Sequence, residues 1–296
     1  MTHSDQPVHY IMHKSEQTAE EILAYWTPER MADAQPVSLP TPPVRTGLAS
    51  RKHHTEPDEQ AFQTTMIRAP RIYLPPYQSA GKLFWTFGGR RLAGSAAVVN
   101  QSGIMTAAHC LYEFSTKLWA ANVLFCPAYT EGSISKFGAW SFTEYGVPEP
   151  WTKIEDFWER HGYDVGLVTL ELDEDGVSIG KVVGQLDLKV GLTPDGSTSW
   201  HTLGYPARAT GDGGYHFNGE DMWECRGNFT GSFKQTVDKE GNLTAGSSGG
   251  PWLLKSGLIL SSTVNGVQSG GPESEQEDFS SDFRNWVTVF YTRYFG

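Results

Sequence analysis

The sequence has little cysteine, no long apolar run and no excess of positive charge. Its 296 residues include three cysteines, Cys110, Cys126 and Cys225, which are too few for a disulfide scaffold. No stretch of eighteen or more apolar residues occurs, so no segment has the length of a membrane-spanning helix. The formal net charge is -11, and an acidic surface repels phosphate backbones. We therefore expect neither nucleic acid nor a membrane as a partner.

Two further kinds of segment are missing. The start of the chain, MTHSDQPVHYIMHK, is polar and lacks the apolar core of a secretory signal. Either the protein stays in the cytosol, or a leader has been removed, and both remain open at this point. No CxxC, HExxH or carboxylate-rich calcium loop is present, so we expect no metal and no other cofactor.

Cys110 and Cys126 are the pair whose spacing suits a disulfide. With fifteen residues between them, a bond would close a loop worth roughly 3 kcal/mol in the chain-entropy model. Spacing does not establish geometry, so this disulfide and free thiols both remain open.

Residues 1–70 differ in composition and in predicted elements from the rest of the chain. A helix is predicted over about 16–26, because Thr18 and Glu21 have the spacing of a capping box. Its apolar stripe, which must be buried somewhere, consists of Ile22, Leu23 and Trp26.

The segment after this helix is rich in proline. The prolines at 36–43 end any helix and favour an extended linker. Beyond them, Arg51, Lys52 and Arg68 offer sites for proteolytic processing. The whole of 1–70 is then either a disordered tail with one apolar helix or a prosegment that docks on the rest of the chain.

From residue 71 onward, short apolar runs alternate with glycine-rich turns. Runs such as KLFWTF, SAAVVN, VGLVTLEL and WVTVFY are rich in Val, Thr and aromatic residues. Helical periodicity is weak except near WTKIEDFWER. This pattern predicts an all-β fold, either a sandwich or a barrel.

The segment AGSSGGPW, residues 245–252, contains a candidate nucleophile. Ser248 lies between glycines, and Gly246 would let its own N–H and that of Ser248 point at one spot and form an oxyanion hole. Gly249 and Gly250 would let the chain pass close behind the nucleophile. An ordinary Ser/Gly turn before a strand is the alternative.

A candidate base and a candidate acid lie earlier in the chain. His109 follows an apolar run and small residues, which suits a strand that enters a short helical turn. Asp164 stands at the head of an apolar strand, where a partly buried carboxylate needs a donor such as an imidazole N–H. Asp156 and Asp173 are the alternatives, and both have the acidic neighbours typical of surface charge.

The motifs TAAHC, YDVGLV and GSSGGP, in this order, resemble the chymotrypsin-like serine peptidases. The resemblance implies a double six-stranded β-barrel over 71–296, with His109 as general base, Asp164 as its orienting acid and Ser248 as nucleophile. GYPA at 204–207 and AYWTPERM at 24–31 resemble the bacterial trypsin-like and glutamyl-endopeptidase branch. That branch is usually secreted with a prosegment, so the resemblance implies a secreted, monomeric zymogen that acts on peptides or proteins and binds its own prosegment 1–70.

Three departures from the family pattern limit the resemblance. Ser247 stands where trypsin-type enzymes carry the Asp that pairs with the new amino terminus, so activation cannot follow that route. Asn242 replaces the acid at the base of the specificity pocket, which removes the reason to prefer Arg or Lys. The cysteine expected near Gly94, the usual partner of Cys110, is missing.

The remaining pocket residues also come from the resemblance. Leu243 and Ala245 indicate an apolar or small pocket, and the strand LILSSTVNG should supply its wall through Ser262 and Thr263. Ser262 is also the candidate to help satisfy Asp164.

The sequence thus predicts a serine endopeptidase with a non-basic specificity pocket, working through an acyl-enzyme. Two alternatives keep the same fold: a catalytically silent or prosegment-locked binding protein, and an esterase that uses the same residues.

Overall fold

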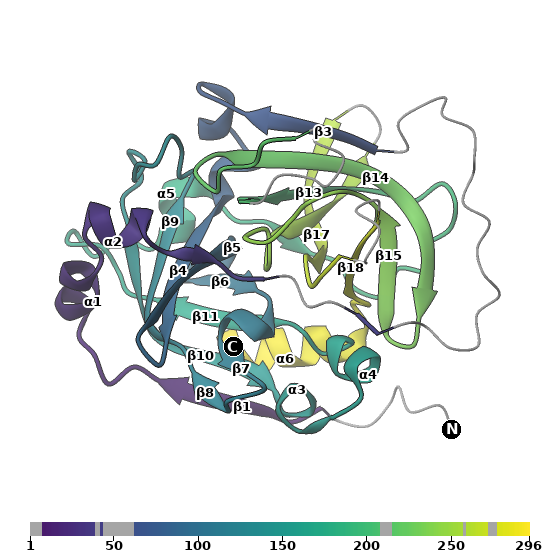
Figure 1. Ribbon diagram of the computed structural model, residues 1–296, viewed down its shortest axis with the longest axis horizontal. Coiled ribbons are helices and arrows are strands. Elements are labelled where there is room, and N and C mark those ends of the chain that lie inside the picture. The colour runs from purple at the N-terminus through teal and green to yellow at the C-terminus, as the bar shows by residue number, and fades with distance from the viewer. Residues whose placement is uncertain (1–7, 39–41, 44–61, 208–214, 257–258, 272–276) are drawn as a thin grey trace.

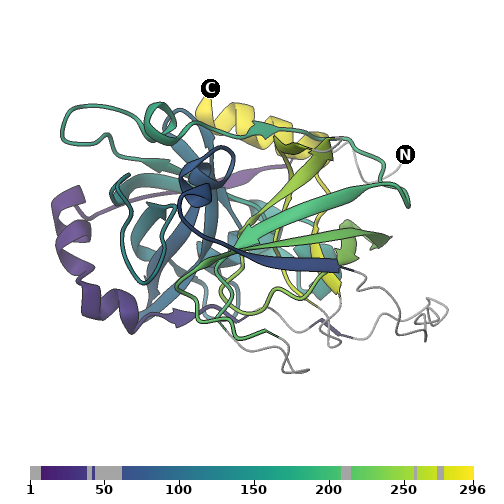
Figure 2. The same ribbon diagram turned by 90° about the horizontal axis from the view of Figure 1, so that it is seen from above.

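The computed structural model describes residues 8–38, 42–43, 62–207, 215–256, 259–271 and 277–296 (Figure 1). Two mostly antiparallel sheets lie side by side, and helices lie around them (Figures 1 and 2). Among the described residues, no helix is long and apolar enough to cross a membrane.

The first sheet contains a closed barrel of six strands. Its order is β1-β10-β11-β6-β5-β4-β9, and β10 also pairs with β9, which closes the ring. β2 pairs in parallel with β5. The strands are β1 (Tyr10–Lys14), β2 (Gln35–Pro36), β4 (Ala80–Phe87), β5 (Arg90–Asn100), β6 (Gly103–Thr106), β9 (Ala121–Pro127), β10 (Trp140–Pro148) and β11 (Gly166–Leu170).

The second sheet has the order β12-β17-β16-β13-β14-β15-β18, with β3 paired to β14. Its strands are β3 (Phe62–Ile67), β12 (Asp187–Leu188), β13 (Ser199–Gly204), β14 (Met222–Phe233), β15 (Thr236–Glu240), β16 (Pro251–Ser256), β17 (Ile259–Val267) and β18 (Glu277–Ser281). A separate two-stranded sheet joins β7 (Tyr112–Glu113) to β8 (Leu118–Trp119).

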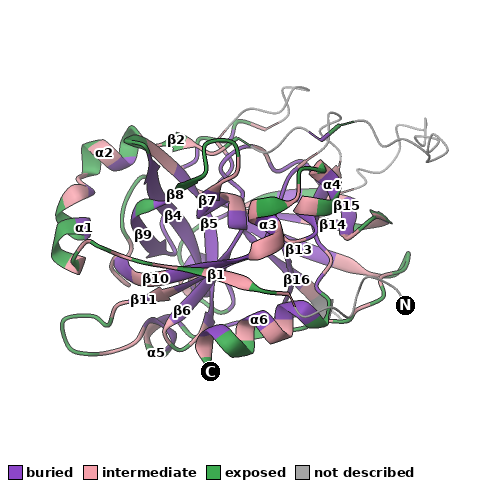
Figure 3. Ribbon diagram, turned by 90° about the horizontal axis from the view of Figure 1, so that it is seen from below, coloured by how far each residue is buried: buried purple, intermediate pink, exposed green. Residues whose placement is uncertain are grey.

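The helices are short apart from the C-terminal one. They are α1 (Ala19–Tyr25), α2 (Pro28–Ala32), α3 (Glu149–Lys153), α4 (Phe157–His161), α5 (Ile179–Val183) and α6 (Asn285–Phe295), with 3-10 turns η2 (Arg71–Tyr73), η3 (Tyr77–Ser79) and η4 (Ala108–Cys110). Figure 3 shows that the strands are mostly buried, whereas α1, α2 and α6 carry exposed outer faces.

The all-β, chymotrypsin-like fold predicted from the sequence is confirmed, with a short N-terminal helix as expected. One run was assigned to the wrong element. WVTVFY has strand-like composition but belongs to α6, because Trp286, Val287, Phe290 and Tyr294 recur at helical spacing and are buried together.

Residues 8–38 pack on the first barrel. β1 pairs with β10 over five residues, and the predicted capping box of Thr18 and Glu21 starts α1. Ile22 and Trp26 of the predicted stripe are buried, whereas Leu23 is 44% exposed and its assignment to the stripe was wrong. Residues four apart share a helix face, but a neighbouring residue points about 100° away.

Candidate active site

His109 and Asp164 are brought together by the pairing of β6 with β11. Thr106, the last residue of β6, lies opposite Gly166, the first residue of β11. His109 follows Thr106 by three residues, in η4, and Asp164 precedes Gly166 by two. The strand register therefore sets one residue beside the other.

The buried carboxylate of Asp164 accepts three hydrogen bonds. The backbone N–H of His109 donates to Oδ1 at 2.9 Å, and Nδ1 of the same ring lies 2.8 Å from Oδ2. The hydroxyl of Ser269 also donates to Oδ2. This arrangement fixes the imidazole with Nδ1 toward the acid and Nε2 on the opposite side of the ring.

The serine that donates to Asp164 is Ser269, not Ser262 as predicted from the sequence. Ser262 is exposed on β17, whereas Ser269 lies beyond the end of that strand and contacts Asp164. Sequence reasoning missed Ser269. The available signal was a serine before two glycines just after a strand, which permits a side chain to turn inward at a strand end.

The two partners shift each other's pKa. Burial by itself raises the pKa of Asp164, but the charge and hydrogen bond of His109 outweigh it, so this pKa lies below its ordinary value. Burial lowers the pKa of His109, but the charge of Asp164 outweighs it and holds this pKa well above 6.5. Each partner therefore favours the charged form of the other.

Asp156 and Asp173 form hydrogen bonds and ion pairs elsewhere and do not contact His109 in the described structure. Asp156 caps α4 by accepting from the N–H of Glu159 at 2.8 Å, and it pairs with Lys234 at 2.6 Å. Asp173 accepts from the N–H groups of two residues in its own turn. Neither is a partner of His109, as their acidic neighbours had indicated.

The loop before Ser248 is a closed turn. Gly246 has φ +93°, a conformation that side-chain-bearing residues rarely adopt. Ser247 is fully buried, and both its N–H and its hydroxyl donate to the carbonyl of Thr244, at 3.1 and 2.7 Å. Ser247, which stands where trypsin-type enzymes carry Asp, thus stabilises this turn through two hydrogen bonds to one carbonyl.

The chain after Ser248 runs close to the strand that leads to His109. Gly249 has φ +82°, and a Cβ atom there would lie 2.9 Å from the backbone nitrogen of Ala107. The carbonyl of Ser248 accepts from the N–H of Ser95 at 2.7 Å. These contacts hold the Ser248 loop, which precedes β16 of the second sheet, against the first barrel.

Ser248 and His109 both lie where the Ser248 loop meets the first barrel, but their side chains are not hydrogen-bonded to each other. Ser248 is fully buried, and neither its Oγ nor Nε2 of His109 has a hydrogen-bond partner among the described residues. The N–H of Gly246, a predicted oxyanion donor, donates to the carbonyl of Val37 at 3.0 Å.

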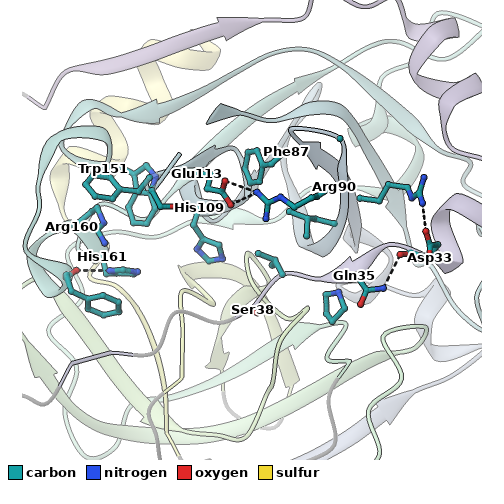
Figure 4. A pocket seen from close by; sticks show the side chains of 18 residues that line it. Asp33, Gln35, Ser38, Phe87, Arg90, His109, Glu113, Trp151, Arg160 and His161 are labelled. Carbon is teal, nitrogen blue, oxygen red and sulfur yellow. Dashed lines mark hydrogen bonds and ion pairs between the residues drawn. The ribbon is translucent and has the colours of Figure 1, made fainter. Parts of the chain in front are cut away.

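A cavity of about 750 Å³ opens beside His109 (Figure 4). Trp151, Arg160 and His161 line one end, and the side chains of Gln35 and Ser38 lie along another side. The N-terminal segment therefore forms part of the wall of the candidate site.

The predicted pocket residues divide into two groups. Asn242, Leu243 and Ala245 are buried next to the Ser248 loop, and the Asn242 side chain accepts from the Thr64 hydroxyl of β3 at 2.6 Å. Its Nδ2 atom is buried without a partner among the described residues. Thr263, in β17, lies opposite Asp187 of β12, and Ser262 precedes it at the surface.

The three cysteines are free thiols, so the disulfide considered for Cys110 and Cys126 is not formed. Cys110 lies in η4 with its Sγ 4.0 Å from the carbonyl of Ser248, whereas Cys126 lies opposite Lys82 in the barrel wall. Burial raises the pKa of Cys126 to about 12, which leaves the thiol protonated. Within the described part of the chain, no three His, Cys, Asp or Glu side chains gather as metal ligands.

Comparisons with family models and with curated proteins gave no match. Solved structures do match. The thermostable serine protease AL20 from an extremophilic microorganism is 28% identical, with TM-score 0.64, and the alignment covers 73% of this chain and 96% of that one. The protease Anisep from Arthrobacter nicotinovorans is also 28% identical, with TM-score 0.63 and coverage of 73% and 94%.

A third structure, a Glu endopeptidase in complex with MPD, is 19% identical, with TM-score 0.61 and coverage of 78% and 95%. At that identity the likeness concerns the fold alone. Taken with the closed six-stranded barrel, the matches show that this chain has the chymotrypsin-like fold and that its structural neighbours are bacterial serine proteases.

Proposed function

We propose that this chain is a serine endopeptidase in which Ser248 is the nucleophile, His109 the general base and Asp164 the residue that orients the base. The observation that carries the proposal is the buried contact of 2.8 Å between Nδ1 of His109 and Asp164, beside the glycine-flanked Ser248. Such a pair leaves Nε2 available to accept a proton from a serine hydroxyl.

The reaction would proceed through an acyl-enzyme. Oγ of Ser248 attacks the peptide carbonyl carbon while Nε2 of His109 takes its proton, and the N–H groups of Gly246 and Ser248 stabilise the oxyanion. The C–N bond then breaks, and His109 gives its proton to the leaving amine. Water attacks the ester, His109 again takes a proton, and its return to Oγ releases the acid and restores Ser248.

The proposed specificity is for uncharged residues before the cut. Asn242 carries no charge that would hold Arg or Lys, and Leu243 and Ala245 supply apolar or small surfaces. The Oδ1 atom of Asn242 accepts a hydrogen bond from the hydroxyl of Thr64, which is also uncharged.

The zymogen organisation is also part of the proposal. Residues 1–70 would act as a prosegment that is cut at basic residues such as Arg51, Lys52 or Arg68, and the secreted, monomeric state is inferred from the family resemblance. Positions 44–61, including Arg51 and Lys52, lie outside the described residues.

Labelling with a serine-reactive fluorophosphonate, followed by peptide mapping, tests the assignment. Labelling should fall on Ser248 once the prosegment has been displaced, and Ser248→Ala should abolish both the label and peptide hydrolysis, a loss on the order of 10⁶ in turnover. Ser247→Ala tests the register of the motif, because the Ser247 hydroxyl donates to the carbonyl of Thr244 and this variant should keep the label on Ser248.

The same preparation separates the alternatives. Labelling of Ser247 instead of Ser248 would contradict the assignment of the nucleophile. Ester hydrolysis without cleavage of any peptide in a library would favour the esterase, and dominant cleavage after Arg would contradict the proposed pocket.

A further inference from the structure

The segment of residues 33–38, here called the strap, crosses the candidate active site. We propose that the strap is an inhibitory ligand in cis, which blocks the site by occupying the Gly246 donor of the oxyanion hole. This inference rests on the proposed function, because it takes Gly246 as an oxyanion donor.

Val37 is the residue that connects the strap to both halves of the site. Its N–H donates to the carbonyl of Ala93 in β5 at 2.8 Å, and its carbonyl accepts from the N–H of Gly246 at 3.0 Å. β2, just before it, runs parallel to β5, with Gln35 opposite Leu92. One residue therefore bridges the first barrel and the Ser248 loop.

This bridge competes directly with a substrate. A peptide carbonyl that is to be attacked must accept a hydrogen bond from the Gly246 N–H, and the Val37 carbonyl already holds that donor. Ser248 is at the same time fully buried. Figure 4 shows Ser38, the next residue of the strap, across the cavity from His109.

The strap is bound as an inhibitor and not as a substrate. Attack on Val37 would require the Ser248 hydroxyl to be bonded to Nε2 of His109, but neither atom has a partner among the described residues. Of the two proposed oxyanion donors, only Gly246 donates to the Val37 carbonyl in the described contacts. The bond between Val37 and Ser38 should therefore stay intact.

The strap is anchored upstream by buried apolar side chains. Ile22 and Met31, in α1 and α2, are 0% and 4% exposed and belong to the core of the first barrel. Trp26 is buried as well, and its ring N–H donates to the carbonyl of Asn122 in β9 at 2.6 Å.

Polar contacts strengthen the same anchor. The Gln17 amide donates to the Asn122 side chain at 2.7 Å and accepts from the Asn122 N–H at 3.0 Å, and Asp33 pairs with Arg91 of β5. A cut after residue 43 would leave all of these contacts in place. Activation should therefore require residues 8–38 to leave the barrel, in addition to a cut.

Two full-length variants test the strap. Val37→Pro removes the N–H that bonds to Ala93 without touching the proposed catalytic residues. Since one hydrogen bond is worth roughly 0.5–1.5 kcal/mol, fluorophosphonate labelling of Ser248 should become about 2- to 10-fold faster. Trp26→Ala removes the anchor at a distance and should accelerate labelling by about tenfold or more.

Gln35→Ala is the matched control. Gln35 lies in the same strap, but it is exposed, and its side chain donates only to the carbonyl of Asp33 among the described contacts. This variant should be labelled at the rate of the unmodified protein. Ser248→Ala in each background identifies the labelled residue, and circular dichroism shows that each variant is folded.

The outcomes distinguish the two proposals. If the unmodified chain is labelled as fast as Val37→Pro and Trp26→Ala, the strap does not inhibit, although Ser248 remains the nucleophile. If folded variants with a loosened strap are never labelled, the proposed function fails and the inference fails with it. A cut between Val37 and Ser38 that Ser248→Ala abolishes would make the strap a substrate and overturn the inference.

Discussion

A buried carboxylate remains charged only where donors surround it, and Asp164 has three such hydrogen bonds. In the proposed mechanism this charge stabilises the imidazolium that forms when His109 takes a proton. It also raises the pKa of His109, so the fraction of neutral base increases as the pH rises through that pKa. Hydrolysis should accordingly increase with pH on the acid side of its optimum.

Ser269 donates to the same Oδ2 of Asp164 that faces Nδ1 of His109, so we expect it to be a positioning residue. Ser269→Ala should lower kcat by about tenfold and leave KM nearly unchanged, because a hydrogen bond to a charged group contributes roughly 1.5–3 kcal/mol, of which part is recovered by relaxation. Steady-state kinetics on a peptide substrate measures both constants. Since Ser269 also lowers the pKa of Asp164, the acid limb of the pH profile should move as well.

Ser262→Ala is the control for that experiment. This serine is exposed on β17 and should be silent in kcat, in KM and in the pH profile. Equal losses of kcat in Ser269→Ala and Ser262→Ala would mean that the Ser269 hydroxyl does not act through the pair of Asp164 and His109.

At the scale of single elements, α4 contains a second histidine in an unusual environment. His161 is almost fully buried, and Nδ1 lies 2.7 Å from the carbonyl of Phe157, so this nitrogen must carry the proton. Its ring stacks on Phe157 with centroids 3.9 Å apart, and Nε2 has no partner among the described residues. Burial lowers its pKa to about 4, because a second proton would place a charge in this apolar site.

That lowered pKa sets the sign of the stability effect. The unfolded His161 binds a proton below pH 6.5, but the folded form does so only near 4, so the free energy of unfolding falls as the pH drops through this window. The loss is at most about 3 kcal/mol on the scale of about 1.4 kcal/mol per pKa unit. Urea unfolding between pH 4 and 7 should show a shallower decline for His161→Phe.

The comparison at pH 7 is the control, since the histidine is neutral in both states there and only packing differs. An identical pH slope in the two proteins would contradict the assignment. Protonation of Asp164 also destabilises the protein in acid, and His161 contributes to the lowered pKa of Asp164, so the difference between the two proteins reports on the coupled pair.

Elements differ in how far the sequence determines them. The strands VGLVTLEL and SAAVVN and the turn at His109 were predicted correctly, because their apolar runs and small residues act locally. α6 was missed because valine and aromatic residues favour strands on average, and only its packing on the barrel selects the helix. The two-residue β2 has no local signal, since Gln35 and Pro36 form a strand only against β5.

The sequence predicts part of the candidate site, because local motifs mark some of its residues. His109, Asp164 and Ser248 lie in three distinctive motifs, but Ser269 and the Val37 contact join residues far apart in the chain. Tertiary contacts of this kind depend on where loops cross, which no local pattern encodes.

At the scale of the whole molecule, the proposed boundary at residue 70 divides one structural unit. β3, at Phe62–Ile67, pairs with β14 over six residues, and Ile67 is 1% exposed. Thr64 also donates to Asn242, the residue proposed for the base of the specificity pocket. β3 therefore belongs with the second sheet, and a processed enzyme that is to stay stable should begin before Phe62.

Two truncated chains test this boundary, one beginning at residue 44 and one at Arg71. The shorter chain loses the strand hydrogen bonds of β3 and the burial of Ile67, and it leaves the Oδ1 of Asn242 without its donor, so it should unfold at a urea concentration well below the longer one. Thr64→Val in the longer chain is the matched control: it keeps β3 and removes the hydroxyl that contacts Asn242 and Cys225, and it should alter the cleavage preference more than the stability. If the chain from Arg71 is as stable and as selective as the chain from residue 44, β3 is dispensable and the boundary at 70 stands.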